Sequence, residues 1–218
     1  MSKYCHENSP VYIQGTDIPK NKLGLEDSEL LHEIEAHLLE EAYRVFIDEL
    51  QTDTVFNEAY FKSLHHRTFK TLYDWAGEYR TVNMSKSGSR FCQAAYLETE
   101  SKRIFTELAQ DGYLKHSVNW PMERVAEKLA YYACELIALH PFYGLNGRIT
   151  RLFFDLIAVY NGYEFIDYTE SATTNGTGGN PYIEASIDCV QFADCAKMQA
   201  IMLRGLKHPS STTNQHND

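Results

Sequence analysis

One run of twelve residues, 140–151, constrains this chain most strongly, because it joins the end of one predicted helix to the start of another. From Ile149 onward, apolar residues recur at helical spacing. They form one stripe: Ile149, Leu152, Phe153, Leu156, Ile157 and Tyr160. Arg148 and Arg151 lie off that stripe and share another face, three positions apart. The pattern predicts a helix whose first turn carries two guanidinium groups.

The start of this helix has the features of an anion site. Asn146 stands where an N-cap is expected, and Gly147 leaves room for close approach to the backbone. A helix N-terminus offers main-chain N–H groups, and the neighbouring arginines can pair with phosphate oxygens. His140 precedes Pro141, which places it at a helix exit a few residues upstream. The run therefore predicts a polyphosphate site with a histidine beside it.

The run HPFYGLNGRITR resembles the motif of the Fic family, H-P-F-x-[D/E]-G-N-G-R-x-x-R. Two further segments, NKLG at 21–24 and DWAGEYR at 74–80, are similar to Fic sequences, so the resemblance covers residues 20–205. It implies an all-α, Fic-type helical bundle with one small β-hairpin, called the flap. It also implies transfer of AMP from ATP to a Ser, Thr or Tyr hydroxyl of a target protein or of the enzyme itself.

The same resemblance implies a role for each residue of the motif. His140 would be the general base that takes the proton from the attacking hydroxyl, and pyrophosphate would leave the α-phosphate. An unperturbed imidazole titrates near pH 6.5 and is mostly neutral at physiological pH, as a base must be. The phosphates would be held by Asn146, Gly147, Arg148 and Arg151, and the loop would be positioned by Phe142, Gly144 and Leu145.

Two positions depart from the family pattern. Gly144 stands where the family has an acidic Mg²⁺ ligand, so we expect Mg²⁺ to be held mainly by the ATP phosphates and assign no metal ligand to the protein. Leu145 stands where the family has glycine; if that position has a positive φ, leucine costs about 1–2 kcal/mol there. Alternatively, Gly144 takes the special backbone angle one residue early.

These departures leave three functions open. The first is a protein adenylyltransferase weakened by the pair Gly144-Leu145. The second is a catalytically inactive Fic-fold module that binds a partner, and the third is a Fic enzyme that transfers another phosphate-containing group. The inhibitory pattern of many Fic proteins, [S/T]-x-x-x-E-[G/N], is matched only in its first part, by 54–58, before Ala59. We therefore expect restraint by a separate antitoxin-like protein, or a loop that is already slow.

A second element of the expected site is the hairpin. Residues 81–84 and 90–92 flank a small polar turn, which predicts two short strands. The resemblance implies that this flap binds the target as an added strand through main-chain hydrogen bonds. A surface hairpin without a partner is the alternative. The flap residues are Ser85, Lys86, Ser87, Gly88, Ser89 and Arg90.

Composition limits the remaining function classes. The 218 residues are 44% hydrophobic, enough for one domain with a core, and the net charge of −10 argues against a nucleic-acid partner. No long apolar run indicates a membrane segment. The histidines lack metal-site spacing, and the scattered cysteines predict reduced thiols in a cytoplasm, without a disulfide framework or zinc site. The cysteines are Cys5, Cys92, Cys134, Cys189 and Cys195.

Periodicity and breaker residues divide the chain into an irregular N-terminal arm (1–22), the Fic domain (23–207) and a disordered tail (208–218). Within the domain we predict a loop at 169–181. The predicted helices span 28–50, 57–73, 98–110, 121–140, 147–160 and 182–206.

Overall fold

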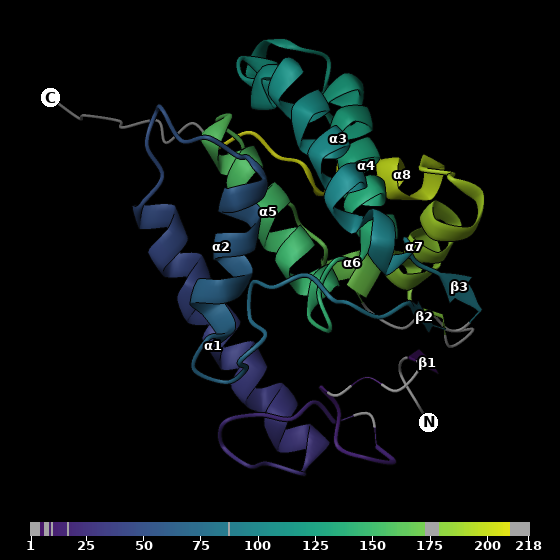
Figure 1. Cartoon of the computed structure of the whole chain (residues 1–218). Helices are drawn as coiled ribbons and strands as arrows, with labels where there is room; N and C mark the ends of the chain where they lie inside the picture. The colour runs from purple at the N-terminus through teal and green to yellow at the C-terminus, as the bar shows by residue number, and fades with distance from the viewer. Residues whose placement is uncertain are drawn as a thin grey trace, which may run out of the picture.

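The computed structural model describes residues 5–6, 9, 11–16, 18–86, 88–172 and 179–209, and its helices pack into one bundle (Figure 1). The fold is all-α with a small sheet, as predicted. The α-helices are α1 (Ser28–Asp48), α2 (Glu58–Phe69), α3 (Leu97–Gln110), α4 (Met122–Leu139), α5 (Asn146–Tyr160), α6 (Thr169–Ala172), α7 (Pro181–Phe192) and α8 (Ala196–Gly205). Short 3₁₀ turns are Ala94–Tyr96, Gly112–Leu114 and Ser117–Asn119.

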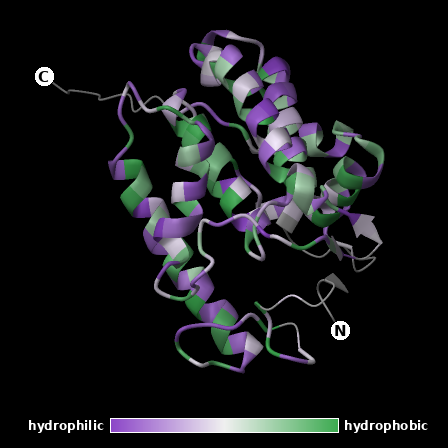
Figure 2. Cartoon of the chain, in the orientation of Figure 1, coloured by the Kyte–Doolittle hydropathy of each residue, from purple (hydrophilic) through white to green (hydrophobic). Residues whose placement is uncertain are grey.

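Helices α4 and α5 form the centre of the bundle. Helix α4 contacts α3, α5, α7 and α8, while α1 and α2 pack on α5. Helix α5 is buried on more than its predicted stripe, because Phe154 and Ala158 on its other side are also buried. Apolar colour accordingly runs along α5 in Figure 2. The end of α4 and the start of α5 therefore meet inside a well-packed core.

Side-chain caps fix where several helices begin. Asp27 accepts hydrogen bonds from the N–H groups of Glu29 and Leu30 at the start of α1. Asn57 accepts one from Tyr60 at the start of α2. Such caps satisfy N–H groups that have no partner within the helix. They fix the first turns of α1 and α2, the two helices that pack on α5.

The sheet has three antiparallel strands in the order β1-β2-β3. Strands β2 (Met84–Lys86) and β3 (Ser89–Arg90) form the predicted hairpin, but its strands lie mostly within the run 85–89 that we predicted as the turn, and not at 81–84 and 90–92. Strand β1 (Cys5–His6) comes from the segment that we predicted as an irregular arm. A strand at a sheet edge needs only main-chain partners, so the side chains of β1 gave no pattern from which a strand could be predicted. Ser87 of the predicted flap lies outside the described residues.

The C-terminal part of the chain differs from its prediction. The single helix predicted for 182–206 is wrong: α7 ends at Phe192, and Ala193 adopts a left-handed conformation (φ 53°) that breaks the helix before α8. Helix α6 lies in the predicted loop 169–181, of which residues 173–178 fall outside the described residues. The tail was predicted to be disordered, and its residues from 210 onward also lie outside the described residues.

The cysteine prediction needs a correction. Cys134 of α4 and Cys189 of α7 are joined by a disulfide, with Cα atoms 5.1 Å apart. Packing of α7 on α4 brings together residues that are 55 positions apart, which spacing along the chain did not indicate. The sulfur of Cys195 lies within 4.8 Å of both. The expected cytoplasmic location rested partly on reduced thiols and stays a prediction.

Among the described residues, no helix combines the length and the apolar character that crossing a lipid bilayer requires.

Candidate active site

The motif loop leaves α4 through a strained residue. His140 is the C-cap of α4, and its φ of 46° places it in the left-handed region. Its N–H still donates to the Leu136 carbonyl at 3.0 Å, so the turn closes on the helix end. Such a conformation persists where the surroundings over-determine it, and it is frequent at functional sites. It ends the helix at the histidine and turns the chain into the buried segment 141–143.

Phe142 anchors the loop in the core. Its side chain is fully buried and lies against the ring of Phe61 at 5.6 Å and the ring of His65 at 4.0 Å, measured between centroids. Because burial of an aromatic ring contributes strongly to packing, these contacts fix the loop relative to α2.

Asn146 closes the loop and does not cap the helix. Its Oδ1 accepts from the Phe142 N–H at 2.8 Å, and its Nδ2 donates to the Phe142 carbonyl at 2.8 Å. The N-cap residue is Leu145, without a side-chain capping bond, so our N-cap prediction for Asn146 is wrong. Both ends of the amide are used within the loop. These two bonds hold the side chain across the loop, and the main chain of Asn146 forms part of the first turn of α5.

Leu145 itself takes the special backbone angle. Its φ is 65°, in the left-handed region, while Gly144 has no positive φ. The alternative in which Gly144 takes over this angle is therefore wrong. A left-handed L-residue costs about 1–2 kcal/mol, which glycine would avoid. This chain places a strained, partly buried leucine where the helix begins.

The side chain of Arg80 connects the motif loop to the flap through hydrogen bonds. Its side chain is almost fully buried, and its Nε donates to the His140 carbonyl at 2.8 Å. The other guanidinium nitrogens donate to the carbonyls of Val82, before β2, and of Cys92, after β3. One buried cation thus joins both ends of the hairpin to the end of α4. Burial lowers the pKa of Arg80 to about 10.

The imidazole of His140 is buried and stacks on the ring of Phe91, with centroids 3.7 Å apart and an interplanar angle of 9°. Burial lowers the pKa of His140 to about 3, and the positive charges of Arg80 and Lys86 act in the same direction. At neutral pH the imidazole is therefore neutral, and in this buried state its proton affinity is lower than that of an exposed imidazole.

His65 is a residue whose part in the site our sequence reasoning missed. Its Nε2 lies 3.2 Å from the Gly144 carbonyl, and its Nδ1 accepts from the Gly77 N–H at 3.0 Å. The second bond makes Nε2 the donor, so His65 holds the backbone of the motif loop. Burial lowers the pKa of His65 to about 3. Its position four residues after the buried Phe61 was the signal that could have found it.

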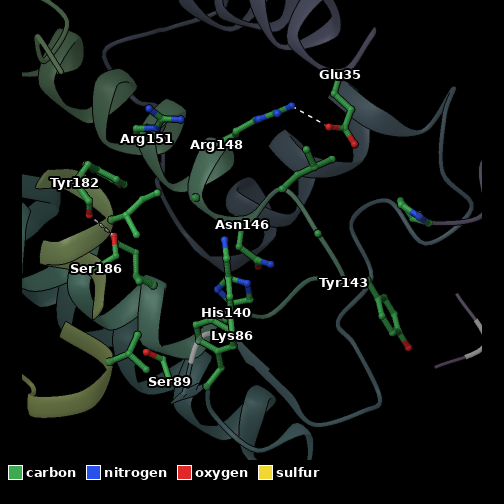
Figure 3. A pocket seen from close by; sticks show the side chains of 18 of the residues that line it. Glu35, Lys86, Ser89, His140, Tyr143, Asn146, Arg148, Arg151, Tyr182 and Ser186 are labelled. Atoms are coloured by element: carbon green, nitrogen blue, oxygen red, sulfur yellow. Dashed lines mark hydrogen bonds and ion pairs between the residues drawn. The ribbon is translucent and has the colours of Figure 1, made fainter. Parts of the chain in front are cut away.

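A pocket of about 340 Å³ opens above the loop (Figure 3). Five parts of the chain supply most of its walls, and Pro19, Trp75, Phe91 and Ile137 complete them. The loop and α5 contribute His140, Tyr143, Gly144, Leu145, Asn146, Gly147, Arg148 and Arg151; the flap contributes Lys86 and Ser89; α1 contributes His32 and Glu35; the arm contributes Tyr12; and α7 contributes Tyr182, Ile183, Ser186, Ile187 and Val190.

The pocket brings together most of the predicted site. Phe142 lies beneath the loop, and three flap residues are not among the lining residues. These three are Ser85, Gly88 and Arg90. At Gly147, no atom outside its chain neighbours and the backbone of its own helix lies within 4 Å of where a Cβ would sit, so the first turn of α5 is open toward the pocket.

The two arginines of α5 already have contacts in the protein. Arg148 donates to Glu35 of α1 at 3.0 Å, and Glu35 is buried and also accepts from the Tyr73 hydroxyl at 2.6 Å (Figure 3). Arg151 lies over the ring of Tyr182 at 5.3 Å. The sequence signal for Glu35 was a carboxylate four residues after the buried Leu31.

The charge of the pocket is opposite to that of the protein. Its lining carries Lys86, Arg148 and Arg151 against Glu35, the one carboxylate among the described lining residues, whereas the whole chain has a net charge of −10. Positive groups around an open helix N-terminus suit a phosphate-bearing ligand.

Comparison with known proteins identifies the family. The Fic/DOC family model matches residues 55–158, which include the loop, α4 and the flap. "Probable protein adenylyltransferase Fic" of Salmonella typhimurium is 30% identical over 161 residues, 74% of this chain and 78% of the relative. The chain belongs to the Fic/DOC family. "Protein adenylyltransferase VbhT" of Bartonella schoenbuchensis is 31% identical over 165 residues, which span 75% of this chain and 33% of VbhT.

Solved structures share the Fic fold over nearly the whole chain. The BepC effector of Bartonella tribocorum, crystallised with AMPPNP, superposes with a TM-score of 0.76 at 22% identity, covering 91% of this chain and 96% of BepC. The Fic domain of a Bartonella quintana effector with bound ADP gives 0.75 at 21% identity, covering 92% and 96%. The bundle, the hairpin and the loop described above therefore form a Fic fold.

The lowered pKa of His140 predicts a pH dependence of stability. In the unfolded state His140 binds a proton near pH 6.5, whereas in the native state it binds one only near pH 3. Its contribution to the free energy of unfolding is therefore fully present above pH 6.5 and is lost as the pH falls toward 3. Between pH 7.5 and pH 5, wild type should lose about 2 kcal/mol of unfolding free energy that His140→Gln does not lose.

Urea unfolding of both proteins at the two pH values measures this difference, in which the titrations of His65 and Asp155 cancel. The exposed His37 provides the matched control, because His37→Gln should follow wild type. Equal pH dependence of His140→Gln and wild type would contradict a buried, neutral His140.

Proposed function

We propose that this protein is a Fic-type protein adenylyltransferase that moves AMP from ATP to a Ser, Thr or Tyr hydroxyl of a target protein or of itself. The observation that carries the proposal is the pocket: a neutral histidine lies beside an open helix N-terminus with three cationic side chains. The names of the relatives support the same activity, since they are adenylyltransferases.

In the proposed reaction, His140 accepts the proton of the target hydroxyl as the hydroxyl oxygen attacks the α-phosphorus of ATP. The bond from that phosphorus to the bridging oxygen breaks, and pyrophosphate leaves with the bond electrons. His140 then returns the proton to solvent. General base catalysis of this kind typically contributes about 10²–10⁴-fold.

The residues proposed to bind phosphate act in two ways. The main chain of Asn146 and Gly147 at the first turn of α5 would donate N–H groups to phosphate oxygens. Arg148 and Arg151 would add charge-assisted bonds from the same helix. Arg148 would keep Glu35 as a partner, which holds its guanidinium at the pocket wall before the ligand arrives.

The site offers a poor set of protein ligands for Mg²⁺. Gly144 provides no side-chain oxygen, and the carboxylate of Glu35 is engaged by Arg148 and Tyr73. Mg²⁺ can instead be carried by the phosphates of ATP, since it keeps several waters and needs few protein ligands. The ion would then enter as part of the substrate.

The protein target would bind at the flap. Lys86 and Ser89 face the pocket, which suits a target segment paired with β2 beside His140. We further propose that the enzyme acts in the cytoplasm and that a separate antitoxin-like protein restrains it. The donor nucleotide can be tested directly by offering ATP, GTP, CTP and UTP.

Incubation with α-³²P-labelled ATP tests the proposed function. A labelled protein band supports it, provided that mass spectrometry finds AMP attached to a tyrosine, serine or threonine. One observation favours the second candidate, an inactive binding module: the strained Leu145 and the side-chain-free Gly144 sit at the phosphate approach. Absence of label at millimolar ATP, with ATP binding retained, would favour that module.

Replacing Arg148 or Arg151 by alanine should affect nucleotide binding in different ways. Arg151→Ala should weaken ATP binding by about 10-fold or more, because a charge-assisted bond contributes about 1.5–3 kcal/mol. Arg148→Ala alone would also leave Glu35 buried without its cation and destabilise the fold. Arg148→Ala combined with Glu35→Gln removes that complication.

Calorimetry with a non-hydrolysable ATP analogue measures the affinity, and thermal unfolding measures the stability of each variant. Arg44→Ala, on the exposed face of α1, is the matched control and should bind as wild type does. Unchanged affinity in both the Arg151 variant and the Arg148/Glu35 double variant would remove these arginines from the proposed phosphate site.

A further inference from the structure

The flap already has a strand at its edge. Strand β1 pairs antiparallel with β2, so that Cys5 lies opposite Ser85 and His6 lies opposite Met84. Strand β2 pairs with β3 on its other side. The flap strand β2 is therefore the middle strand of the sheet, and its outer edge is occupied by the chain's own N-terminal segment (Figure 1).

The opposite edge of the flap is covered by a helix. Strand β3 packs against α7, and the side chain of Ser89 is buried there. The Nε2 of Gln191 on α7 donates to the Ser89 hydroxyl at 3.0 Å. Within the described residues, the edge that can accept an added strand is thus that of β2, and β1 fills it.

The segment that follows β1 is anchored at the active-site loop. Tyr12 is buried, and its hydroxyl donates to the Tyr143 carbonyl at 2.5 Å. Tyr12 also forms an isolated bridge with Pro19. The hydroxyl of Tyr143 lies 3.1 Å from the Thr81 N–H, just before the flap. A short tether from such an anchor gives its free end an effective concentration in the millimolar range.

We propose that the N-terminal segment containing β1 is an internal competitor of the protein target, which occupies the β2 edge in the free enzyme and leaves before a target strand pairs there. Strand addition uses main-chain hydrogen bonds, so the competitor and the target need no common sequence. The apparent affinity for the target falls with the fraction of molecules whose edge is free. The competition rests on the proposed function, in which the flap binds a target; the occupancy does not.

Hydrogen exchange tests the occupancy without any catalysis. In the full-length chain, Cys5→Pro combined with His6→Pro removes the main-chain donors of β1. The Ser85 amide, which faces β1, should then exchange about tenfold faster than in wild type, the ratio that corresponds to one net hydrogen bond. The amides of Met84 and Lys86 face β3 and serve as internal references. Cys5→Ala combined with His6→Ala keeps those donors and should exchange as wild type does. Equal exchange in the proline variant and wild type would overturn the proposal.

A reversible lock tests the competition. Ser85→Cys places a second thiol opposite the native Cys5, at a separation that a disulfide can bridge. Once mass spectrometry confirms that bond, transfer of labelled AMP to a mixture of synthetic eight-residue peptides with central Ser, Thr or Tyr should fall at least about tenfold. Dithiothreitol should restore it.

The matched control is Ser85→Cys combined with Cys5→Ser, which cannot form the lock but keeps the native cysteines of α4 and α7. Its transfer should not depend on the lock conditions, apart from any effect of reducing Cys134–Cys189. Equal transfer by locked and reduced Ser85→Cys would overturn the competition. If wild type labels neither a peptide nor itself, the proposed function fails, and hydrogen exchange alone decides the occupancy.

Discussion

Transfer of AMP is expected to fall by about 10²–10⁴-fold in His140→Ala, with the nucleotide affinity nearly unchanged. A general base acts on the proton that moves in the transition state, so its loss lowers kcat more than it weakens ground-state binding. His140 suits that role because its imidazole is neutral at physiological pH and lines the pocket beside the N-terminus of α5.

The measurement is single-turnover labelling with α-³²P-ATP, together with calorimetry for binding and circular dichroism for the fold. His37→Ala removes an exposed imidazole from α1 and is the matched control. The stacking partner Phe91 is tested separately by Phe91→Leu, which should keep most of the activity. A His140→Ala protein that labels at the wild-type rate would exclude the base role.

The second large effect is a gain. Gly144→Glu combined with Leu145→Gly should raise AMP transfer by up to about 10²-fold over wild type, because both changes bear on the placement of the α-phosphate. Glutamate would supply an oxygen ligand that Mg²⁺ prefers. A side chain fits at 144, since an added Cβ would meet only a ring carbon of Trp75, at 3.4 Å.

The structure gives the Leu145→Gly half of this prediction its physical reason. Leu145 has φ 65°, which glycine adopts without steric cost, and its side chain lines the pocket where phosphate must approach. Stability should change little, because relief of about 1–2 kcal/mol of strain is offset by lost side-chain packing and by the entropy of glycine.

Labelled-ATP transfer at matched Mg²⁺, in wild type, both single variants and the double variant, measures the gain. Each single variant should gain less than the double, since an ion without room for phosphate, or room without the ion, still misplaces the reacting atom. Gly144→Gln is the control that matches glutamate in size but lacks its charge. A double variant no faster than wild type would contradict a weakened Fic site.

Much of this fold could be predicted from the local sequence, because its signals are periodic apolar residues, a proline at a helix end and one contiguous motif. The apolar stripe of α5 and the Pro-terminated end of α4 are written at fixed spacings, so the helices on both sides of the loop could be placed. The motif itself is one contiguous run, and its residues line one pocket as a result. The broken C-terminal helix was missed because Ala193 carries no breaker signal for its left-handed turn.

The sequence by itself determined the all-α class, the Fic family and the identity of the loop, because each depends on residues that are neighbours along the chain. Only the tertiary structure decided which distant groups surround that loop: Glu35 beside Arg148, His65 on the Gly144 carbonyl and Arg80 below His140. It also decided that β1 occupies the flap edge. Main-chain pairing and the meeting of buried polar groups depend on how helices pack, and no spacing along one chain encodes those distances.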